Sequence, residues 1–182
     1  MGNPSPLRVL LEGRPGIGKT TVVRRLATLL RDAGVRLGGF VTDEIRAHGR
    51  REGFMVEALS GDRGVLAHVE LPGPPRAGRY GVDLQTFERI ALAALPSGGV
   101  VVVDELGKME LASAPFRDAV SALWDRDVAV VATVQSHHHP FTDAFKQRPD
   151  VQALRVTEHS RDALPDRLAA RLRTIGAPGR AR

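Results

Sequence analysis

A segment near the N-terminus carries glycines where a phosphate-binding loop needs them. Residues 13–20 read Gly13-Arg14-Pro15-Gly16-Ile17-Gly18-Lys19-Thr20 and fit the pattern G-x-x-x-x-G-K-[ST]. The glycines let the backbone curl, so that successive N–H groups point at phosphate oxygens, and the following helix directs its positive end at the same anion. We expect Lys19 to reach the outer phosphates and the Thr20 hydroxyl to bind Mg²⁺. All eight residues and the next one, Thr21, are candidate nucleotide-binding residues.

Two carboxylates follow a run of four valines later in the chain. Val100–Val103 shows no polar alternation, which is typical of a strand buried on both faces of a parallel sheet, and Asp104 and Glu105 come directly after it. P-loop proteins place a second magnesium contact at such a strand end. We predict that Asp104 holds Mg²⁺ and that Glu105 orients and polarises an attacking water. With Lys19, these are the candidate catalytic residues; the competing interpretation of the pair is a strand end that turns into solvent.

The elements around these motifs alternate between strands and helices. A strand at 7–11 precedes the glycine loop and a helix at 20–33 follows it, as the motif requires. The alternation predicts an α/β fold with a mostly parallel central sheet, helices on both faces and an antiparallel hairpin insertion. The other expected elements are strands at 38–46, 53–59, 65–69, 100–103, 128–134 and 153–156, helices at 84–95, 113–125, 141–148 and 162–174, and a loop at 71–81.

Length and composition limit the class of protein. The chain has 182 residues, of which 42% are hydrophobic and 26% charged, and this excludes wholesale disorder and coiled coil. No repeat or long linker divides it, so we expect one domain over 1–182, with a core at about 7–174 and a flexible tail at 175–182. Cysteine is absent, which excludes disulfides, thiolate catalysis and cysteine-held metal sites. The sequence shows no signal peptide and no apolar run of membrane-spanning length, and we expect a cytoplasmic protein.

The charge is basic but dispersed. The formal net charge is +5 and the pI about 10.6, which favours anionic ligands. The arginines are scattered among acidic residues and cluster only at 46–51, so a solvated surface is favoured over a nucleic-acid partner. We expect a monomer that binds nucleoside triphosphates and no membrane.

The glycine loop and three further segments resemble the thermophile-type nucleoside-triphosphatase family, also known as the cancer-related nucleoside-triphosphatase family. The resemblance covers about residues 7–172. The three segments read Gly39-Phe40-Val41-Thr42-Asp43-Glu44-Ile45-Arg46, Gly49-Arg50-Arg51-Glu52-Gly53-Phe54 and Asp104-Glu105-Leu106-Gly107-Lys108-Met109-Glu110-Leu111. The resemblance is most specific over the last of them.

This resemblance implies a RecA-like P-loop domain that hydrolyses ATP, GTP and other nucleoside triphosphates to the diphosphate and phosphate, slowly and with broad base tolerance. It also implies that Lys108 and Glu110 belong to the site, with Lys108 either near the phosphates or in a salt bridge to Glu110 or Asp104. One departure bears on base preference. The family usually has Asn-Arg-Asp before the last helix, and this chain has Ser160 in the Asn place.

A small P-loop nucleotide or nucleoside kinase is the alternative function. A kinase needs an acceptor pocket and usually a mobile lid that carries arginines, whereas the loop at 73–79 is short and offers only Arg76 and Arg79. The Asp104-Glu105 pair favours water as the acceptor. A nucleic-acid-dependent ATPase or switch is a third reading, with little support from the scattered arginines.

Several polar side chains keep two interpretations. Arg46, Arg50 and Arg51 could supply a cationic finger to the γ-phosphate, as Arg161 could, or be hairpin-surface charges. Asp43 and Glu44 could lie near the metal or pair with those arginines. A last case is the run of three histidines at 137–139, for which an exposed loop is favoured over a transition-metal site.

Overall fold

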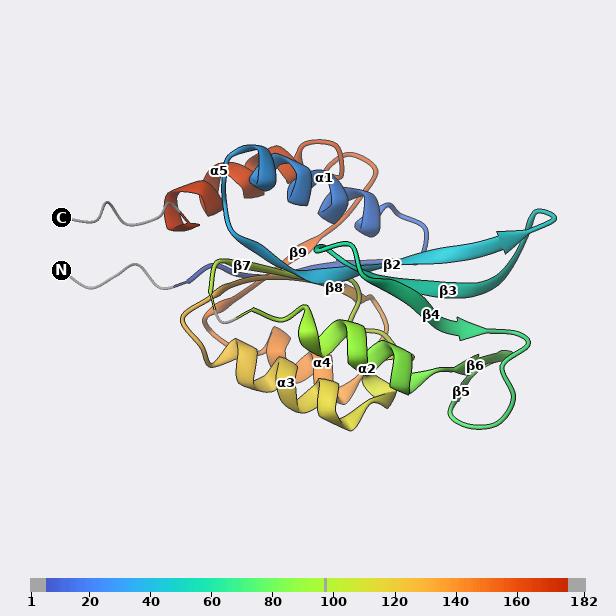
Figure 1. Cartoon of the computed structure of the whole chain (residues 1–182). Coiled ribbons are helices and arrows are strands. Elements are labelled where there is room, and N and C mark those ends of the chain that lie inside the picture. The colour runs from blue at the N-terminus through green and yellow to red at the C-terminus, as the bar shows by residue number, and fades with distance from the viewer. Residues whose placement is uncertain (1–5, 97, 177–182) are drawn as a thin grey trace.

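One mixed β-sheet organises the structure, a computed structural model that describes residues 6–96 and 98–176, with side chains up to residue 173. The strand order over the described residues is β5-β6-β4-β3-β2-β7-β8-β1-β9 (Figure 1). The strands are β1 (Arg8–Gly13), β2 (Leu37–Ala47), β3 (Arg50–Ala58), β4 (Arg63–His68), β5 (Arg76–Ala77), β6 (Tyr80–Val82), β7 (Val100–Val103), β8 (Ala129–Gln135) and β9 (Val151–Arg155).

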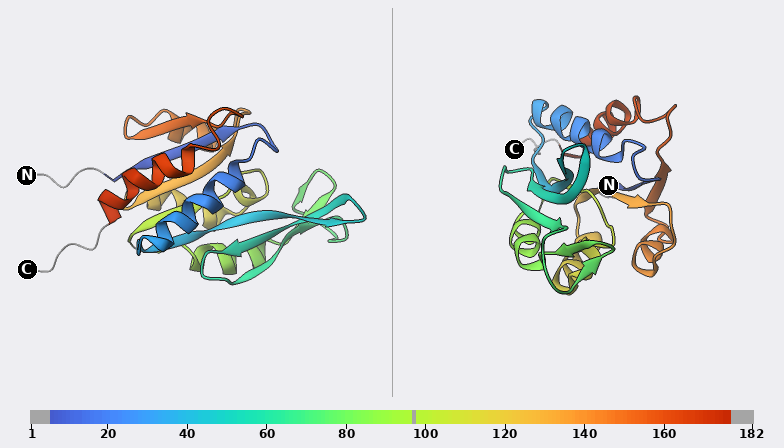
Figure 2. Two further views of the ribbon diagram at one scale, coloured as in Figure 1. Left: turned by 90° about the horizontal axis from the view of Figure 1, so that it is seen from above. Right: turned by 90° about the vertical axis from the view of Figure 1, so that its right-hand side faces the viewer.

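The sheet has a parallel and an antiparallel half that share β2. Strands β2, β7, β8, β1 and β9 pair in parallel, and β3, β4, β6 and β5 continue the sheet in antiparallel pairs. Helices α1 and α5 cover one face, and α2, α3 and α4 cover the other (Figures 1 and 2). Their bounds are α1 (Lys19–Asp32), α2 (Leu84–Ala93), α3 (Ala114–Trp124), α4 (Pro140–Lys146) and α5 (Leu164–Gly176).

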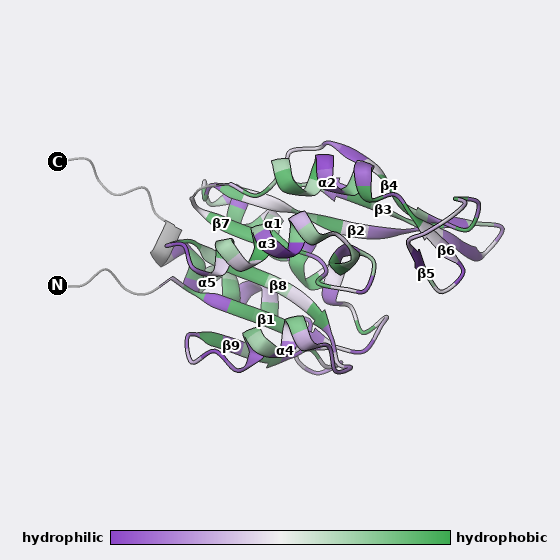
Figure 3. Ribbon diagram, turned by 90° about the horizontal axis from the view of Figure 1, so that it is seen from below, coloured by the Kyte–Doolittle hydropathy of each residue, from purple (hydrophilic) through white to green (hydrophobic). Residues whose placement is uncertain are grey.

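The central strands are buried on both faces. Val9 and Leu11 of β1 pack in a cluster with α1 and α5, and Leu10 packs in the cluster on the opposite face. The valines of Val100–Val103 divide between the same two clusters, and each is at most 1% exposed. Because successive strand residues point to opposite faces, a strand covered by helices on both sides must be apolar throughout. Figure 3 shows this as continuous green along much of β1, β7 and β8.

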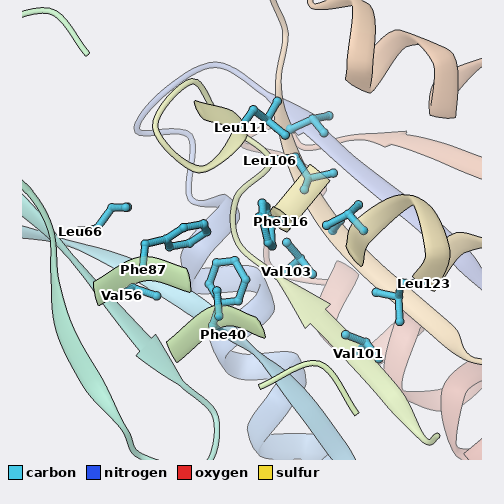
Figure 4. Close-up of a cluster of buried hydrophobic side chains, with 14 of the residues drawn as sticks. Phe40, Val56, Leu66, Phe87, Val101, Val103, Leu106, Leu111, Phe116 and Leu123 are labelled. Carbon is cyan, nitrogen blue, oxygen red and sulfur yellow. The ribbon is translucent and has the colours of Figure 1, made fainter. Parts of the chain in front are cut away.

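Three phenylalanines fill the core below the sheet. The ring of Phe116 on α3 lies 4.9 Å from that of Phe87 on α2 and 5.6 Å from that of Phe40 on β2, in edge-to-face contacts (Figure 4). All three side chains are fully buried. Edge-to-face pairs add stabilisation beyond the burial of area, so this cluster fixes both helices against β2.

The predicted elements are largely present, with shifts at their ends. Ser113 caps α3 as expected, since its Oγ accepts a hydrogen bond of 3.1 Å from the Phe116 N–H. The loop expected at 71–81 is wrong at 76–77 and 80–81, which belong to β5 and β6. These strands are two and three residues long and too short for a periodic pattern. A 3₁₀ turn at Glu110–Ala112 was also not predicted. Helix α5 continues to Gly176, so residues 175 and 176 of the expected tail are helical, and 177–182 lies outside the described residues.

Glu110, at the start of that 3₁₀ turn, is a carboxyl enclosed by the protein. It is 1% exposed, and its Oε2 has no hydrogen-bond partner among the described residues. Burial, and secondarily the negative charge of Glu105, raises the pKa of Glu110 from 4.5 to about 8. The native protein therefore favours the neutral acid at this position.

Among the described residues, no helix is both long enough and apolar enough to cross a membrane.

Removal of the Phe116 ring will test the phenylalanine cluster. We expect Phe116→Ala to lower the free energy of unfolding by about 3–5 kcal/mol, because the contacts to two rings are lost and a cavity remains. The measurement is urea denaturation followed by circular dichroism. Val65→Ala is the control, since Val65 is 37% exposed and should cost less than about 1 kcal/mol. Equal losses in both variants would contradict the packing described here.

The buried Glu110 makes stability depend on pH. Its folded pKa of about 8 lies above the ordinary value of 4.5, so between these values the native state holds a proton that the unfolded chain releases. Stability should therefore fall as pH rises through this window, by roughly 1 kcal/mol per pH unit, and level off above it. Glu110→Gln cannot ionise and should show a clearly shallower slope in urea titrations at several pH values, with a remainder from Asp104, whose pKa burial also raises. An identical slope in both proteins would mean that Glu110 is charged in the native state.

Candidate active site

The glycine loop joins the end of β1 to the start of α1. Gly16 and Gly18 adopt positive φ angles of 77° and 107°, a left-handed region that glycine enters at little steric cost. Gly18 is the N-cap of α1 and has no side chain to satisfy the first N–H groups of the helix. These groups are therefore available to an anion, and the helix dipole favours negative charge at the same place.

Lys19 is held in one orientation beside the loop. Its side chain is buried, and its Nζ donates hydrogen bonds to the carbonyl oxygens of Gly13, at 2.9 Å, and Arg14, at 3.4 Å. The same Nζ lies 3.5 Å from Oε2 of Glu105. The geometry brings one cation and one carboxylate from the two predicted motifs to the same point, although 86 positions separate them in the numbering.

Asp104 occupies a polar niche at the carboxyl end of β7. It is 1% exposed; its Oδ2 accepts a 2.7 Å hydrogen bond from the Thr20 hydroxyl, and its Oδ1 accepts one from the Thr133 hydroxyl. Burial raises the pKa of Asp104, against the lowering effect of these two hydroxyls. Thr133 comes from β8, which lies between β1 and β7 in the sheet. Sequence reasoning missed it, since nothing local marks a threonine within an apolar strand.

Glu105 is held in place by a residue of β8. Its Oε1 accepts a hydrogen bond of 2.6 Å from Nε2 of Gln135, the last residue of that strand. Oε2 faces Lys19. Gln135 was likewise not predicted, because its role depends on which strands are neighbours. A Cβ at Gly107 would come within 3.1 Å of Oε1 of Glu105 and 2.8 Å of Oε2 of Glu110, so both carboxylates lie against the same glycine.

A cavity of about 520 Å³ brings most of the predicted site together. Of the candidates it includes Pro15, Gly16, Gly18, Lys19, Thr20, Thr21, Asp104 and Glu105. It is also lined by residues for which two interpretations were open, Asp43, Glu44 and Arg51, and by residues that the sequence did not single out, namely Arg24, Thr42, Phe54, Met109 and Gln135. The cavity thus extends past the phosphate loop toward the β2–β3 hairpin.

Four candidates lie outside the cavity lining. The Gly13 carbonyl instead accepts from Lys19, and the Ile17 side chain is buried in the core beneath the loop. The guanidinium of Arg14 points to the surface, where it pairs with Glu158 at 3.1 Å. Lys108 is exposed, and among the described residues it forms no ion pair with Glu110 or Asp104. The salt bridge considered for Lys108 is therefore absent among the described residues, and a place near the phosphates stays a prediction.

The hairpin charges are largely paired with one another. Glu44 binds Arg46 at 2.6 Å and Arg51 at 2.7 Å, and these hydrogen bonds lower the pKa of Glu44. Arg51 also lies over the rings of Phe54 and Tyr80, at 5.1 and 5.9 Å from their centroids. Of the three hairpin arginines, only Arg51 lines the cavity. Asp43 pairs with Arg24 on α1 rather than with a hairpin arginine, a partner that the sequence did not predict.

The histidine run has a structural role at the start of α4. The side chain of His139 accepts a hydrogen bond from the Phe141 N–H, at 3.2 Å, and His138 pairs with Asp143. No group of three or more His, Cys, Asp or Glu side chains suited to a metal ion occurs in the part of the chain that the structure describes.

The residues at the loop fit a hard divalent cation. The Thr20 hydroxyl and the Asp104 carboxylate lie within 2.7 Å of each other, both through oxygen, and oxygen is the donor that Mg²⁺ prefers. The burial that raises the pKa of Asp104 also means that this carboxylate gains from a nearby positive charge. Mg²⁺ commonly takes one or two carboxylates together with substrate phosphates, and these side chains can supply the protein's share.

Comparison with known proteins identifies the family of this chain. A family model described as NTPase matches residues 8–169. A nucleoside-triphosphatase THEP1 from Methanopyrus kandleri is 44% identical over 169 residues, which cover 90% of this chain and 93% of that protein. The THEP1 of Thermotoga petrophila is 41% identical over 162 residues, or 87% and 88% of the two chains.

Two solved structures share the architecture. The crystal structure of THEP1 from the hyperthermophile Aquifex aeolicus superposes with a TM-score of 0.81 at 30% identity and covers 91% of this chain and 99% of its own. The solution structure of a human cancer-related nucleoside triphosphatase gives a TM-score of 0.78 at 36% identity, covering 92% and 98%. The chain therefore belongs to the THEP1-type nucleoside-triphosphatase family of P-loop hydrolases.

Proposed function

We propose that the chain hydrolyses ATP, GTP and other nucleoside triphosphates at the β–γ phosphoanhydride, with Mg²⁺, to the diphosphate and phosphate. The observation that carries this proposal is the convergence of Lys19 and Glu105, 3.5 Å apart, beside the Thr20–Asp104 pair in one cavity. Lys19, Thr20 and Asp104 suit a triphosphate and its metal ion. Glu105 remains as a carboxylate without such a task, and a water molecule is the substrate it can serve.

Each group has a distinct part in the reaction. The N–H groups of the loop and Lys19 bind the triphosphate, and bound Mg²⁺ would neutralise charge on its β- and γ-oxygens. Glu105 orients a water whose oxygen attacks the γ-phosphorus. The bond from that phosphorus to the bridging oxygen then breaks, and the water proton passes through Oε2 of Glu105 to the released phosphate. Gln135 holds Oε1, so that Oε2 keeps its direction.

Slow turnover and broad base tolerance are part of the proposal. Arg51 is the hairpin arginine that lines the cavity, and its guanidinium is bound to Glu44 and stacked on Phe54 and Tyr80. To act as a cationic finger it would have to leave these partners. Because such a finger is worth orders of magnitude in rate where it acts, its engagement elsewhere would make turnover slow.

A kinase is the alternative, and the outer part of the cavity is what favours it. Arg51, Phe54 and Met109 line space beyond Glu105 that could receive an acceptor. Incubation with ATP alone separates the two functions. A triphosphatase releases phosphate steadily, whereas a kinase releases almost none without an acceptor. The monomeric state and the cytoplasmic location stay predictions.

Glu105→Gln tests the role of the carboxylate. The variant keeps the size of the side chain but loses its negative charge and basicity, so we expect phosphate release to fall by roughly 10²- to 10⁴-fold. Triphosphate affinity should change little, because a group that acts on the attacking water contributes mainly in the transition state. Turnover is measured by phosphate release and affinity by titration calorimetry.

Asp104→Asn is the matched comparison, since it makes the same chemical change one residue earlier. It should weaken both affinity and turnover, because Asp104 is assigned to the metal ion. If Glu105→Gln hydrolyses ATP near the parent rate, Glu105 is only a strand-end charge and another carboxylate must orient the water.

Metal removal tests the cofactor. We expect turnover to cease in excess EDTA and to return on addition of Mg²⁺, because the site offers oxygen ligands. Addition of Zn²⁺ to the stripped enzyme is the comparison and should restore much less. Full turnover in EDTA would refute a metal requirement.

A further inference from the structure

A second cavity adjoins the phosphate loop. It has a volume of about 280 Å³ and is lined by Gly18, Thr21, Val22, Arg25, Arg161, Asp162 and Pro165. Gly18 and Thr21 also line the larger cavity, so the start of α1 forms the ridge between the two. None of the candidate catalytic side chains reaches the second cavity.

The direction of a bound triphosphate follows from where its chemistry must occur. The γ-phosphate belongs at Lys19 and Glu105, on the side of the loop that continues toward Phe54. Loop N–H groups hold the α- and β-phosphates, so the chain of phosphates ends near the first turn of α1, at Thr21. The nucleoside therefore leaves the loop at the ridge, away from the hairpin.

We propose that the second cavity binds the nucleoside part of the substrate, with the guanidinium of Arg161 as the surface on which the base stacks. The inference rests on the proposed function, because it assumes a triphosphate on the loop. Arg161 is then a substrate-binding residue of the last loop before α5, rather than a cationic finger to the γ-phosphate.

Contacts with the loop place Arg161 at this position. Its Nη1 donates to the carbonyl oxygen of Ile17 at 3.4 Å, and its Nε lies 3.8 Å from Oδ1 of Asp162. A Cβ at Gly18 would meet its Cδ at 3.6 Å. The side chain is nevertheless 43% exposed, which leaves a face of the planar group open. A guanidinium stacks on any aromatic ring, and every nucleobase offers such a face.

The other residues of the cavity explain why it would discriminate weakly between bases. Asp162 offers a carboxylate that can accept from base N–H groups, but its side chain is 87% exposed, so water competes for these bonds. Arg25 is engaged with Asp166, at 2.7 Å, and with the Asp162 carbonyl, at 3.3 Å. Stacking without strong edge recognition is tolerant of base identity.

Ser160, the residue that departs from the family pattern, does not line this cavity. Its Oγ accepts from the Thr157 N–H at 3.0 Å and donates to the Arg155 carbonyl oxygen at 3.3 Å. It closes the turn that presents Arg161. Ser160 thus contacts the loop backbone and not the cavity, and base preference would depend on its neighbours.

The experiment compares ATP with inorganic tripolyphosphate, which has the phosphates and no nucleoside. Affinities are measured with Mg²⁺ by calorimetry for the parent protein, Arg161→Ala, Arg167→Ala and Lys19→Ala. We expect Arg161→Ala to weaken ATP on the order of 10-fold and to leave tripolyphosphate within about 2-fold. GTP, CTP and UTP should weaken to a similar extent. Arg167→Ala removes the same charge from the exposed side of α5 and should change neither ligand.

Two results would overturn the inference. If Arg161→Ala weakens tripolyphosphate as much as ATP, Arg161 contacts phosphate; if it weakens neither, the base lies elsewhere. A urea midpoint equal to that of the parent protein shows that Arg161→Ala is folded. Lys19→Ala should weaken both ligands, and its failure to do so would refute the phosphate site and not the role of Arg161. Absence of phosphate release by the parent protein would likewise refute only the proposed reaction.

Discussion

The burial of one carboxylate, Asp104, is the constraint on which the rest of the site depends. A carboxylate that is 1% exposed is tolerated only if polar groups or a cation replace the water it has lost. Here the hydroxyls of Thr20 and Thr133 supply two hydrogen bonds, and they come from α1 and β8. Three elements that are distant in sequence must therefore meet at the end of β7. Their meeting also brings the glycine loop beside Glu105.

The position of β8 between β1 and β7 makes this possible. The register pairs Leu11 of β1 with Thr133 of β8, and Val103 of β7 with Ala132 of β8. Thr133 and Gln135 therefore reach the same edge of the sheet as Asp104 and Glu105. Both faces of these strands are covered by helices, so polar groups gather at the strand ends, and the site lies at the carboxyl ends. This is where ligands bind in open α/β sheets. Packing of the two apolar layers thus determines where charge can be placed.

Local patterns sufficed for much of this, and strand order explains what they missed. The loop at 13–20, the valine run and the capping Ser113 each carry a signal within a few residues. Thr133 and Gln135 acquire meaning only through their neighbours across the sheet, and β5 and β6 are too short to show a period. Lys108 belongs to the same motif as Asp104 and Glu105, yet its side chain is exposed and does not line the cavity. Motif membership locates a segment, and only the packing decides which side chains of that segment reach the cavity.

The two ends of the sheet have a consequence for association between molecules. An edge strand exposes unpaired N–H and C=O groups, which can recruit a strand from another chain if it is long and apolar. Strand β5 is two residues long and begins with Arg76, and β9 ends at Arg155 and carries Gln152, which accepts a hydrogen bond from Arg171 of α5. Neither border offers a long apolar template. The edges of this sheet can therefore avoid pairing with strands of other molecules although neither edge is covered by a further strand.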